Sequence, residues 1–402
     1  MMTLEHFFKN TNINKPLEDI WSEIDQYTDE VYVDSTIEIK QKLSTADILL
    51  PPLRDGDKII KGLIGSRAVD YLYSFFPNLG NYFFTIANSM CEAFPKSEKA
   101  DAYFMLYDYP KRAEWFRKTY PNRADKILIP YQDADYTNEY TMLPIDLERD
   151  IDVFMTARMK KVKNLDIFLK ALMYVEEKYG KKLNAVLLSA DAGKVTLDNE
   201  VYAELVEITG SEERLKEFIK IEPNTDYSSL LLYYSRAKLT ALTSLFEGKN
   251  RSIQESVLCN TPVICFSALN QYIKGENSLL PNGCAYYVDQ FTPEAFGKKL
   301  YELISQNKIN YNTRDLALKH FGRKLIIDKI IKIFPYYREQ IPNLMETNIC
   351  DNDYINELMS KQFGLTYEDW LYKNSLLSKP VHEKHNIVLF AYTAIMHYCK
   401  IN

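Results

Sequence analysis

Short apolar runs alternate with longer stretches of helical periodicity along most of this chain. In the first third, runs rich in β-branched and aromatic residues lie at 31–35, 47–52, 82–88, 102–107 and 126–131. Residues 64–76 and 110–119, between these runs, have the spacing of amphipathic helices. Strands that alternate with helices form parallel sheets covered by helices on both faces. We therefore expect an α/β domain in this part of the chain.

A polar segment that contains a proline, QDADYTNEYTMLPIDLERD (132–150), interrupts this pattern and predicts a linker. A second alternation follows, with expected strands at 152–158, 184–190, 218–223, 239–244, 262–266 and 285–289. Its expected helices lie at 164–180, 227–237, 250–259 and 292–306. Open α/β sheets bind ligands at the carboxyl ends of their strands.

The length of 402 residues exceeds what one hydrophobic core usually supports, and it favours more than one domain. We expect an N-terminal α/β domain over residues 1–145 and a C-terminal α/β domain over residues 146–335. Residues 336–402 are helical and aromatic without clear strands, which predicts a helical C-terminal extension.

The charge balance narrows the class of partner. With 49 Lys and Arg against 55 Asp and Glu, the net charge is -6, so we expect no nucleic-acid partner. Uninterrupted apolar stretches are too short to span a bilayer, and charged and amide residues interrupt the N-terminal MMTLEHFFKNTNINK. We expect a cytoplasmic protein. The six cysteines form no CxxC pair and the five histidines no HExxH motif, so a zinc enzyme is not expected.

The segment LTALTSLFEGKNRSIQESVLCNTPVICF (239–266) carries the most informative chemistry. A predicted strand ends near Ser244, a loop carries Glu247, and a helix that begins near Asn250 carries Glu255. Glu255 lies about one and a half turns inside that helix. The amides of 248–252 would lack partners at the helix start and would form an anion site. A carboxylate beside an anion site suits a sugar attached to a phosphate.

Two cations, Arg158 and Lys163, lie in DVFMTARMKKVKNLD. Arg158 ends a predicted strand and Lys163 opens the next helix. Both are therefore expected at the same sheet edge as the Glu247 loop. Two fixed cations and a helix N-terminus can neutralise a leaving diphosphate without a metal.

These segments resemble glycosyltransferase family 4, the retaining nucleotide-sugar enzymes of the GT-B fold. TARMKKVKNLD resembles the family's G-R-L-x-x-x-K-[GN] segment. Residues 239–266 are similar to its P-S-x-x-E-G-[FY]-x-x-x-x-x-E-A-x-x-x-G-x-P-V-[IV] segment, the E-x7-E signature. KILIPYQDAD (126–135) resembles the segment that closes the family's first domain. The likeness covers about 152–306, is weak before 126, and is absent after roughly 340.

The resemblance implies two Rossmann-like domains that face each other across a cleft, with the donor mainly on the second. It implies a retaining, metal-independent hexosyltransferase that uses a UDP- or GDP-sugar and a glycan, lipid-linked or protein acceptor. The family's commonest setting is the synthesis of cell-surface polysaccharide or glycoconjugate. No cofactor and no metal are expected beyond the nucleotide-sugar co-substrate.

The family's site residues carry over to matching positions of this chain. The catalytic group would comprise Glu247 near the anomeric centre, with Arg158 and Lys163 on the diphosphate. Glu255 would form hydrogen bonds with the ribose hydroxyls. The other expected donor-binding residues surround the phosphates: Gly248, Asn250, Arg251 and Ser252.

Departures from the family pattern leave a second interpretation open. Ala157 and Asn260 replace family glycines, and Lys249 replaces an aromatic residue. Many relatives have a His beside the reaction centre, whereas this chain has none between His6 and His320. The alternative is a catalytically degenerate GT-B protein that acts as a binding or regulatory partner.

Acidic triplets leave a third interpretation open, that of a metal-dependent transferase or a nucleotide-sugar epimerase. D-x-D triplets at 55–57, 133–135 and 351–353 could hold a divalent metal, although turns are rich in Asp for other reasons. Sensitivity to a chelator would separate the metal-dependent case from the metal-free one.

The glycine-containing segment KGLIGSR (61–67) has two interpretations. It is either a loop that approaches a phosphate or an ordinary turn before a helix.

A basic run in the first domain, residues 111–126, has two interpretations. Its cations are Lys111, Arg112, Arg117, Lys118, Arg123 and Lys126. Trp115, Phe116 and Tyr120 are interleaved with them. The run is either a solvated helix face over buried aromatic residues or a patch that contacts anionic lipid at the inner membrane face.

Overall fold

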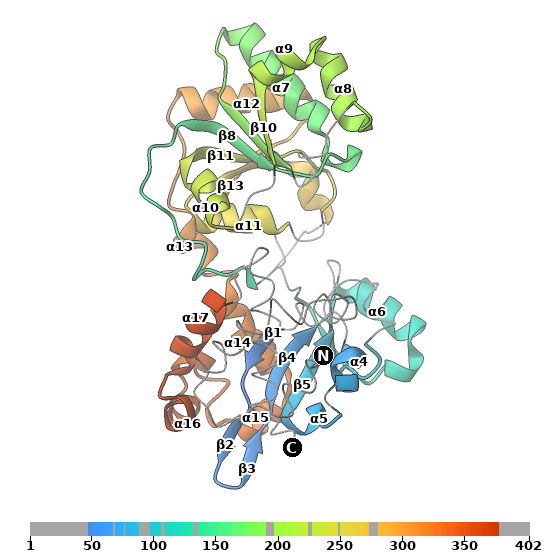
Figure 1. The fold of residues 1–402 in the computed structure, drawn as a ribbon, viewed down its shortest axis with the longest axis vertical. Helices are drawn as coiled ribbons and strands as arrows, with labels where there is room; N and C mark the ends of the chain where they lie inside the picture. The colour runs from blue at the N-terminus through green and yellow to red at the C-terminus, as the bar shows by residue number, and fades with distance from the viewer. Residues whose placement is uncertain are drawn as a thin grey trace, which may run out of the picture. The chain divides into compact units, whose positions relative to one another are not determined.

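The computed structural model of the chain describes two compact units. The described residues are 47–66, 69–75, 77–87, 97–105, 109–131, 136–189, 197–223, 227–247, 250–272 and 280–377. The first unit combines the described residues up to 131 with 327–377, and the second contains those from 136 to 326 (Figure 1). This division differs from the expected boundaries at 145/146 and 335/336. The helices that follow residue 335 belong to the first unit rather than to a separate extension.

The first unit contains a five-stranded sheet in the order β1-β4-β5-β6-β7. Its strands are β1 (Asp47–Leu50), β4 (Gly62–Ser66), β5 (Phe83–Ala87), β6 (Ala102–Phe104) and β7 (Ile127–Ile129). The last four are parallel, and β1 runs antiparallel to β4. A hairpin of β2 (Leu53–Asp55) and β3 (Lys58–Ile60) projects from it, and the helices α4 (Val69–Phe75), α5 (Leu79–Tyr82) and α6 (Tyr109–Thr119) belong to the same unit. The strand expected at 31–35 lies outside the described residues.

Gly62 has a packing role rather than the phosphate-binding role considered for KGLIGSR. It begins the buried strand β4, so this segment is not a loop before a helix. A Cβ atom at Gly62 would lie 2.5 Å from the carbonyl oxygen of Leu50 and 2.8 Å from the ring of Phe83. The glycine therefore permits a close approach of two chain segments in the core of the sheet.

The C-terminal helices complete the core of the first unit. They are α14 (Arg323–Ile333), α15 (Pro335–Gln340), α16 (Asp353–Phe363) and α17 (Tyr367–Leu377), and they lie beside the sheet in Figure 1. The buried Tyr337 hydroxyl donates to the carbonyl oxygen of Gly62 at 2.8 Å. The Asn374 amide donates to the carbonyl oxygen of Ile48 at 3.0 Å. These bonds satisfy backbone groups of β1 and β4 from more than 270 residues away along the chain.

The second unit is a six-stranded parallel sheet in the order β10-β9-β8-β11-β12-β13. Its strands are β8 (Ile151–Thr156), β9 (Ala185–Ser189), β10 (Ile219–Pro223), β11 (Ala237–Leu242), β12 (Val263–Phe266) and β13 (Ala285–Val288). All six expected strands of this part of the chain are confirmed within a few residues. Parallel pairing requires crossover helices, which the alternating pattern predicts.

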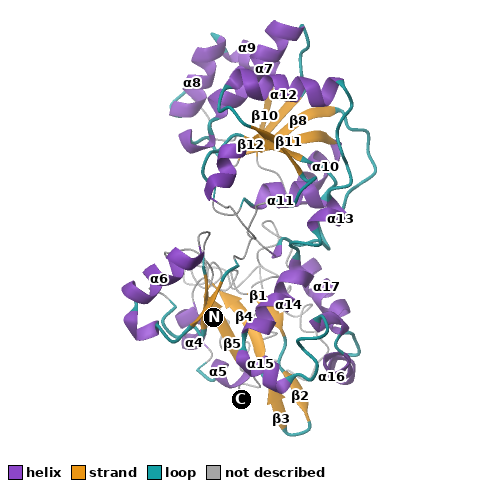
Figure 2. Cartoon of the chain, turned by 180° about the vertical axis from the view of Figure 1, so that it is seen from behind, coloured by secondary structure: helices purple, strands orange, loops and turns teal. Residues whose placement is uncertain are grey.

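Helices cover both faces of this sheet. One face carries α7 (Leu165–Tyr179), α8 (Glu200–Thr209), α9 (Glu212–Phe218) and α12 (Pro293–Ser305). The other carries α10 (Tyr227–Arg236) and α11 (Arg251–Leu258), and α13 (Arg314–Ala317) lies near α11 (Figures 1 and 2). Within the part of the chain that the structure describes, no helix is both long and apolar enough to cross a membrane.

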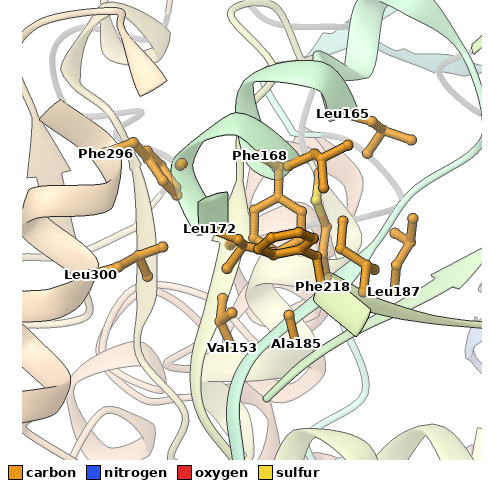
Figure 3. Close-up of a cluster of buried hydrophobic side chains, with 14 of the residues drawn as sticks. Val153, Leu165, Phe168, Leu172, Ala185, Leu187, Phe218, Phe296 and Leu300 are labelled. Atoms are coloured by element: carbon orange, nitrogen blue, oxygen red, sulfur yellow. The ribbon is translucent and has the colours of Figure 1, made fainter. Parts of the chain in front are cut away.

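Apolar side chains from the strands and from α7, α9 and α12 form the core of this unit (Figure 3). Val153 and Leu187 come from neighbouring strands, and Phe168, Phe218 and Phe296 pack above them. Each of these side chains is buried. Their burial, at about 25 cal/mol per Å² of apolar surface, is the main term that holds the helices on the sheet.

The expected linker at 132–150 is fixed to the second unit in its described part, 136–150. The Arg314 guanidinium donates to the carbonyl oxygens of Glu139, at 2.8 Å, and Met142. The backbone N–H of Ile145 donates to the Ser235 hydroxyl at 3.1 Å. This segment is therefore part of the second unit and not a free tether.

Gly297 gives the first test, because α12 approaches α7 at this residue. A Cβ atom there would lie 2.6 Å from the carbonyl oxygen of Ala171, so Gly297→Ala must push the helices apart. Overpacking of this kind costs about 1–3 kcal/mol, more than the helix propensity that alanine adds. We expect a lower melting temperature for Gly297→Ala and little change for the control Lys298→Ala, at the exposed next position. An unchanged or higher melting temperature for Gly297→Ala would contradict this packing.

Candidate functional site

The turn between β8 and α7 is tied to the carboxyl end of β11. After β8, a 3-10 turn (η4, Lys161–Lys163) leads to Asn164, whose φ of 49° and ψ of 47° place it in the left-handed region. The Asn164 side-chain amide donates to the carbonyl oxygen of Thr243 at 3.0 Å. The Thr243 hydroxyl in turn donates to the carbonyl oxygen of Lys163 at 2.8 Å. The two connections therefore hold each other at one edge of the sheet.

Lys163 and Glu247 meet at this edge. The Lys163 ammonium forms an ion pair and hydrogen bond with the Glu247 carboxylate. Their side chains are only 21% and 13% exposed, so the pair is largely shielded from water. From the sequence, both residues are expected at this edge, but on different parts of a ligand. The structure shows that they bind each other.

Arg158 also lies at this edge, directly after β8, but its side chain is exposed. Within the described part of the chain it forms no ion pair or side-chain hydrogen bond. The structure therefore places Arg158 at the expected edge without joining it to the Lys163–Glu247 pair. An exposed guanidinium there is accessible to an anionic group from solution.

The start of α11 is fixed by its own side chains. Asn250 is the N-cap, and its side-chain oxygen accepts hydrogen bonds from the Ser252 backbone N–H, at 2.9 Å, and from the Ser252 hydroxyl. Both residues predicted to bind phosphate are thus already hydrogen-bonded to each other. Gly248 and Lys249, the other residues of the expected phosphate loop, lie outside the described residues.

Glu255 is buried on α11 and has a partner for each oxygen. The Arg251 Nε atom lies 2.9 Å from Glu255 Oε1, and the buried Tyr234 hydroxyl lies 3.3 Å from Oε2. Burial raises the pKa of Glu255 above its usual value. The positive charge of Arg251 and the hydrogen bonds from Arg251 and Tyr234 oppose this rise without cancelling it. The sequence indicated the position of Glu255 in the helix but not its enclosure.

Ser244 is a site feature that the sequence did not single out. It follows β11, three residues before Glu247, and it is fully buried. Its hydroxyl has no hydrogen-bond partner among the described residues. A buried hydroxyl without a partner costs free energy, and such groups in native proteins often lie at sites that a ligand or water completes. Thr243, Asn164 and Tyr234 were also missed, because their roles depend on contacts between distant parts of the chain.

The two carboxylates of the expected signature are thus each neutralised by a cation. Lys163 pairs with Glu247, and Arg251 pairs with Glu255. An anionic ligand at this edge can replace the carboxylates as the partner of the two cations. Hydroxyl groups of a ligand can then donate hydrogen bonds to the carboxylates. The arrangement suits a ligand that carries both kinds of group.

The acidic triplets do not gather with other metal ligands in the described ranges. No group of three or more His, Cys, Asp or Glu side chains there could hold a metal ion. Asp55 instead accepts a hydrogen bond from the Tyr354 hydroxyl at 2.7 Å. Asp351 and Asp353 lie in the turn that starts α16. The triplet at 133–135 lies outside the described residues.

The basic run on α6 is less uniform than the sequence indicated. Arg123 is buried, its guanidinium lies 4.8 Å from the ring centroid of Tyr120, and it is not part of an exposed patch. Lys118 forms an exposed ion pair with Glu114 at 2.7 Å. Lys111, Arg117 and Lys118 are exposed, and Trp115 is 37% exposed with the Arg112 guanidinium 5.0 Å from its ring centroid.

The architecture of two Rossmann-like units indicates the fold class of this protein. The fold class predicted above, an α/β protein with two such domains of the GT-B type, is confirmed. Residues 145–319 match the model of the family described as glycosyl transferases group 1. The match begins just before β8 and ends after α13, so it spans the sheet that carries Lys163, Glu247 and Glu255. The matched residues therefore lie wholly within the second unit.

No match was found among curated proteins. Similar solved structures include the pneumococcal O-GlcNAc transferase GtfA in complex with UDP and GlcNAc, at 13% identity and a TM-score of 0.44. That likeness covers 67% of this chain and 54% of GtfA, so the chain spans about half the length of that relative. Sucrose-phosphate synthase from Thermosynechococcus elongatus is similar at 16% identity and a TM-score of 0.46, covering 69% of this chain and 73% of that one.

The Lys163–Glu247 pair yields a second test. Lys163→Met and Glu247→Gln should each lower the free energy of unfolding, because each leaves one partner shielded and unpaired. The double variant should recover part of that loss, with a coupling energy of about 1 kcal/mol in a double-mutant cycle of urea unfolding. The exposed pair Lys361–Glu357 is the control and should show almost no coupling. Strict additivity for Lys163 and Glu247 would contradict the pair.

Proposed function

We propose that this protein is a retaining glycosyltransferase of family 4 that transfers a sugar from a UDP- or GDP-sugar to a glycan, lipid-linked or protein acceptor. The observation that carries the proposal is the meeting of Lys163 with Glu247 at the carboxyl edge of the second sheet. This edge lies within the range that matches glycosyl transferases group 1. Open α/β sheets bind ligands at this edge.

The leaving diphosphate is neutralised by cations of the chain. Lys163 exchanges Glu247 for the diphosphate, and the exposed Arg158 binds it from the same edge. Charge-assisted hydrogen bonds to phosphate strengthen as negative charge develops on the departing nucleotide, and this lowers the barrier to transfer. In this proposal the two cations Lys163 and Arg158 do the work that a bound metal ion does in other transferases, so no metal is needed.

Each carboxylate binds hydroxyl groups of the donor. Glu247, released from Lys163, accepts hydrogen bonds from the transferred sugar near its anomeric carbon. Glu255 accepts from the ribose hydroxyls. The phosphates lie against the start of α11, where Gly248, Asn250, Arg251 and Ser252 surround them. The helix N-terminus adds the favourable end of its dipole.

Variants of Lys163 and Glu247 test this proposal. Glu247→Gln should lower the rate of donor breakdown about 100-fold or more with a UDP- or GDP-sugar, because it removes a group that acts at the reacting carbon. Lys163→Met should weaken the binding of UDP or GDP about tenfold or more, measured by titration calorimetry. Lys170→Met, on the exposed face of α7, is the control. Full activity and unchanged binding in the two site variants would contradict the roles proposed for Lys163 and Glu247.

A catalytically degenerate binding protein is the second candidate, and one observation favours it. Both signature carboxylates are already paired with cations of the chain, which is how a site that no longer turns over would be stabilised. Such a protein would bind a nucleoside diphosphate or a partner without breaking the donor. Donor breakdown that depends on Glu247 excludes it.

We also propose that α6 contacts anionic lipid at the inner membrane face. Lys111, Arg117 and Lys118 are exposed on this helix, which also exposes part of Trp115, as in helices that lie at a membrane surface. Each basic residue near an anionic surface contributes about 1 kcal/mol, so replacing all three with Ser should weaken vesicle binding about tenfold or more. The measurement is co-sedimentation with phosphatidylglycerol vesicles, with phosphatidylcholine vesicles as control. Unchanged co-sedimentation of the triple variant would contradict a contact of α6 with anionic lipid.

A further inference from the structure

Arg251 covers a buried carboxylate with an exposed cation. It is the first residue of α11, one turn before Glu255, and its Nε atom lies 2.9 Å from Glu255 Oε1. The arginine side chain is 56% exposed, whereas that of Glu255 is 6% exposed. The Arg251 end of this pair is therefore in contact with solvent, and the Glu255 end is buried.

The groups that face Glu255 make Arg251 its counter-ion. The buried Tyr234, from α10, donates a hydrogen bond to the other oxygen, and it is neutral. The buried thiol of Cys259, one turn further along α11, contributes no positive charge. A buried carboxylate without a partner is costly, so Arg251 offsets a charge that the fold would otherwise carry alone.

Arg251 can leave Glu255 without unwinding α11. The Asn250 side chain holds the helix start through its two bonds with Ser252, and neither bond involves the arginine side chain. An exposed guanidinium on a long side chain can therefore turn toward a ligand. Guanidinium groups bind phosphate with two parallel hydrogen bonds, which makes a diphosphate a strong competitor for Arg251.

Resting on the proposed function, we propose that Arg251 is a specificity-determining residue that exchanges partners when the donor binds. In the ligand-free protein it neutralises Glu255. On binding, its guanidinium passes to the diphosphate and the freed oxygen of Glu255 accepts the ribose hydroxyl. A ligand with a ribose but no diphosphate must break the Arg251–Glu255 pair without replacing it. The site thus selects nucleoside diphosphates over nucleosides.

The exchange predicts a rise in phosphate affinity when Glu255 loses its charge. Inorganic pyrophosphate is the probe, because it competes for Arg251 and has no ribose to contact Glu255. Glu255→Gln should bind pyrophosphate about tenfold more tightly than the unaltered protein in titration calorimetry, since Arg251 is released. Arg251→Met should bind it about tenfold more weakly. In the double variant the gain from Glu255→Gln should vanish.

Controls separate this exchange from a general charge effect and from damage to the fold. Arg214→Met removes a comparably exposed arginine from α9 and should leave pyrophosphate affinity unchanged. Arg251→Lys keeps a cation at the helix start and should retain part of the affinity. Melting temperatures confirm that each variant is folded before it is titrated.

Two results would overturn the exchange. One is a gain from Glu255→Gln that persists in the Arg251→Met background, which would show that Arg251 does not mediate it. The other is no gain at all. Parallel titrations with UDP and GDP distinguish a failure of the partner exchange from a failure of the proposed function. If either binds while the pyrophosphate pattern fails, the exchange alone is wrong; if the protein binds neither nucleotide nor pyrophosphate, the exchange and the proposed function fall together.

Discussion

The parallel pairing of β8 with β11 is the constraint on which the candidate site depends. Ile151 lies opposite Ala237, and Phe154 lies opposite Thr240, so both strands end at the same edge of the sheet. The turn after β8 carries Lys163, and the loop after β11 carries Glu247. A change of register would separate the Thr243 hydroxyl from the Lys163 carbonyl and the ammonium from its carboxylate. The packed apolar core beneath the sheet holds this register in place.

Electrostatic balance is the second constraint. Two carboxylates of limited exposure lie in one short segment, and each has a cation bonded to it. Without these cations the site would carry a concentration of negative charge that repels a diphosphate. With them it is nearly neutral until a ligand arrives, and the same cations are then available to the phosphates. The same groups thus contribute both to the stability of the site and to its affinity for an anionic ligand.

Much of the second unit could be predicted from its sequence, because its strands are short apolar runs, and central ones such as β9 and β12 are buried along their whole length. The edge shared by Lys163, Arg158 and Glu247 followed from that pattern, since parallel strands end together. The pairing of Lys163 with Glu247 did not follow, because it depends on side-chain positions that no local pattern fixes. The enclosure of Glu255 by Tyr234 was hidden for the same reason.

The first unit was harder to predict, because its core depends on contacts between the two ends of the described chain. Tyr337 and Asn374 bond to backbone carbonyls of β4 and β1, and a hydroxyl or an amide in a helix gives no local sign of such a partner. The residues after 335 therefore looked like an independent extension. Likewise Gly62 could be assigned from the sequence either to a phosphate loop or to an ordinary turn, whereas its lack of a side chain permits the approach of Leu50 and Phe83.

The most direct test of the central claim is the melting temperature of the protein with UDP-, GDP-, ADP- and TDP-sugars, each with and without EDTA. A ligand that binds only the folded protein raises the melting temperature as its concentration passes its dissociation constant. A metal-free nucleotide-sugar site predicts a rise with UDP- or GDP-sugars that EDTA leaves unchanged. No rise with any of the four classes, or a rise that EDTA abolishes, would contradict it.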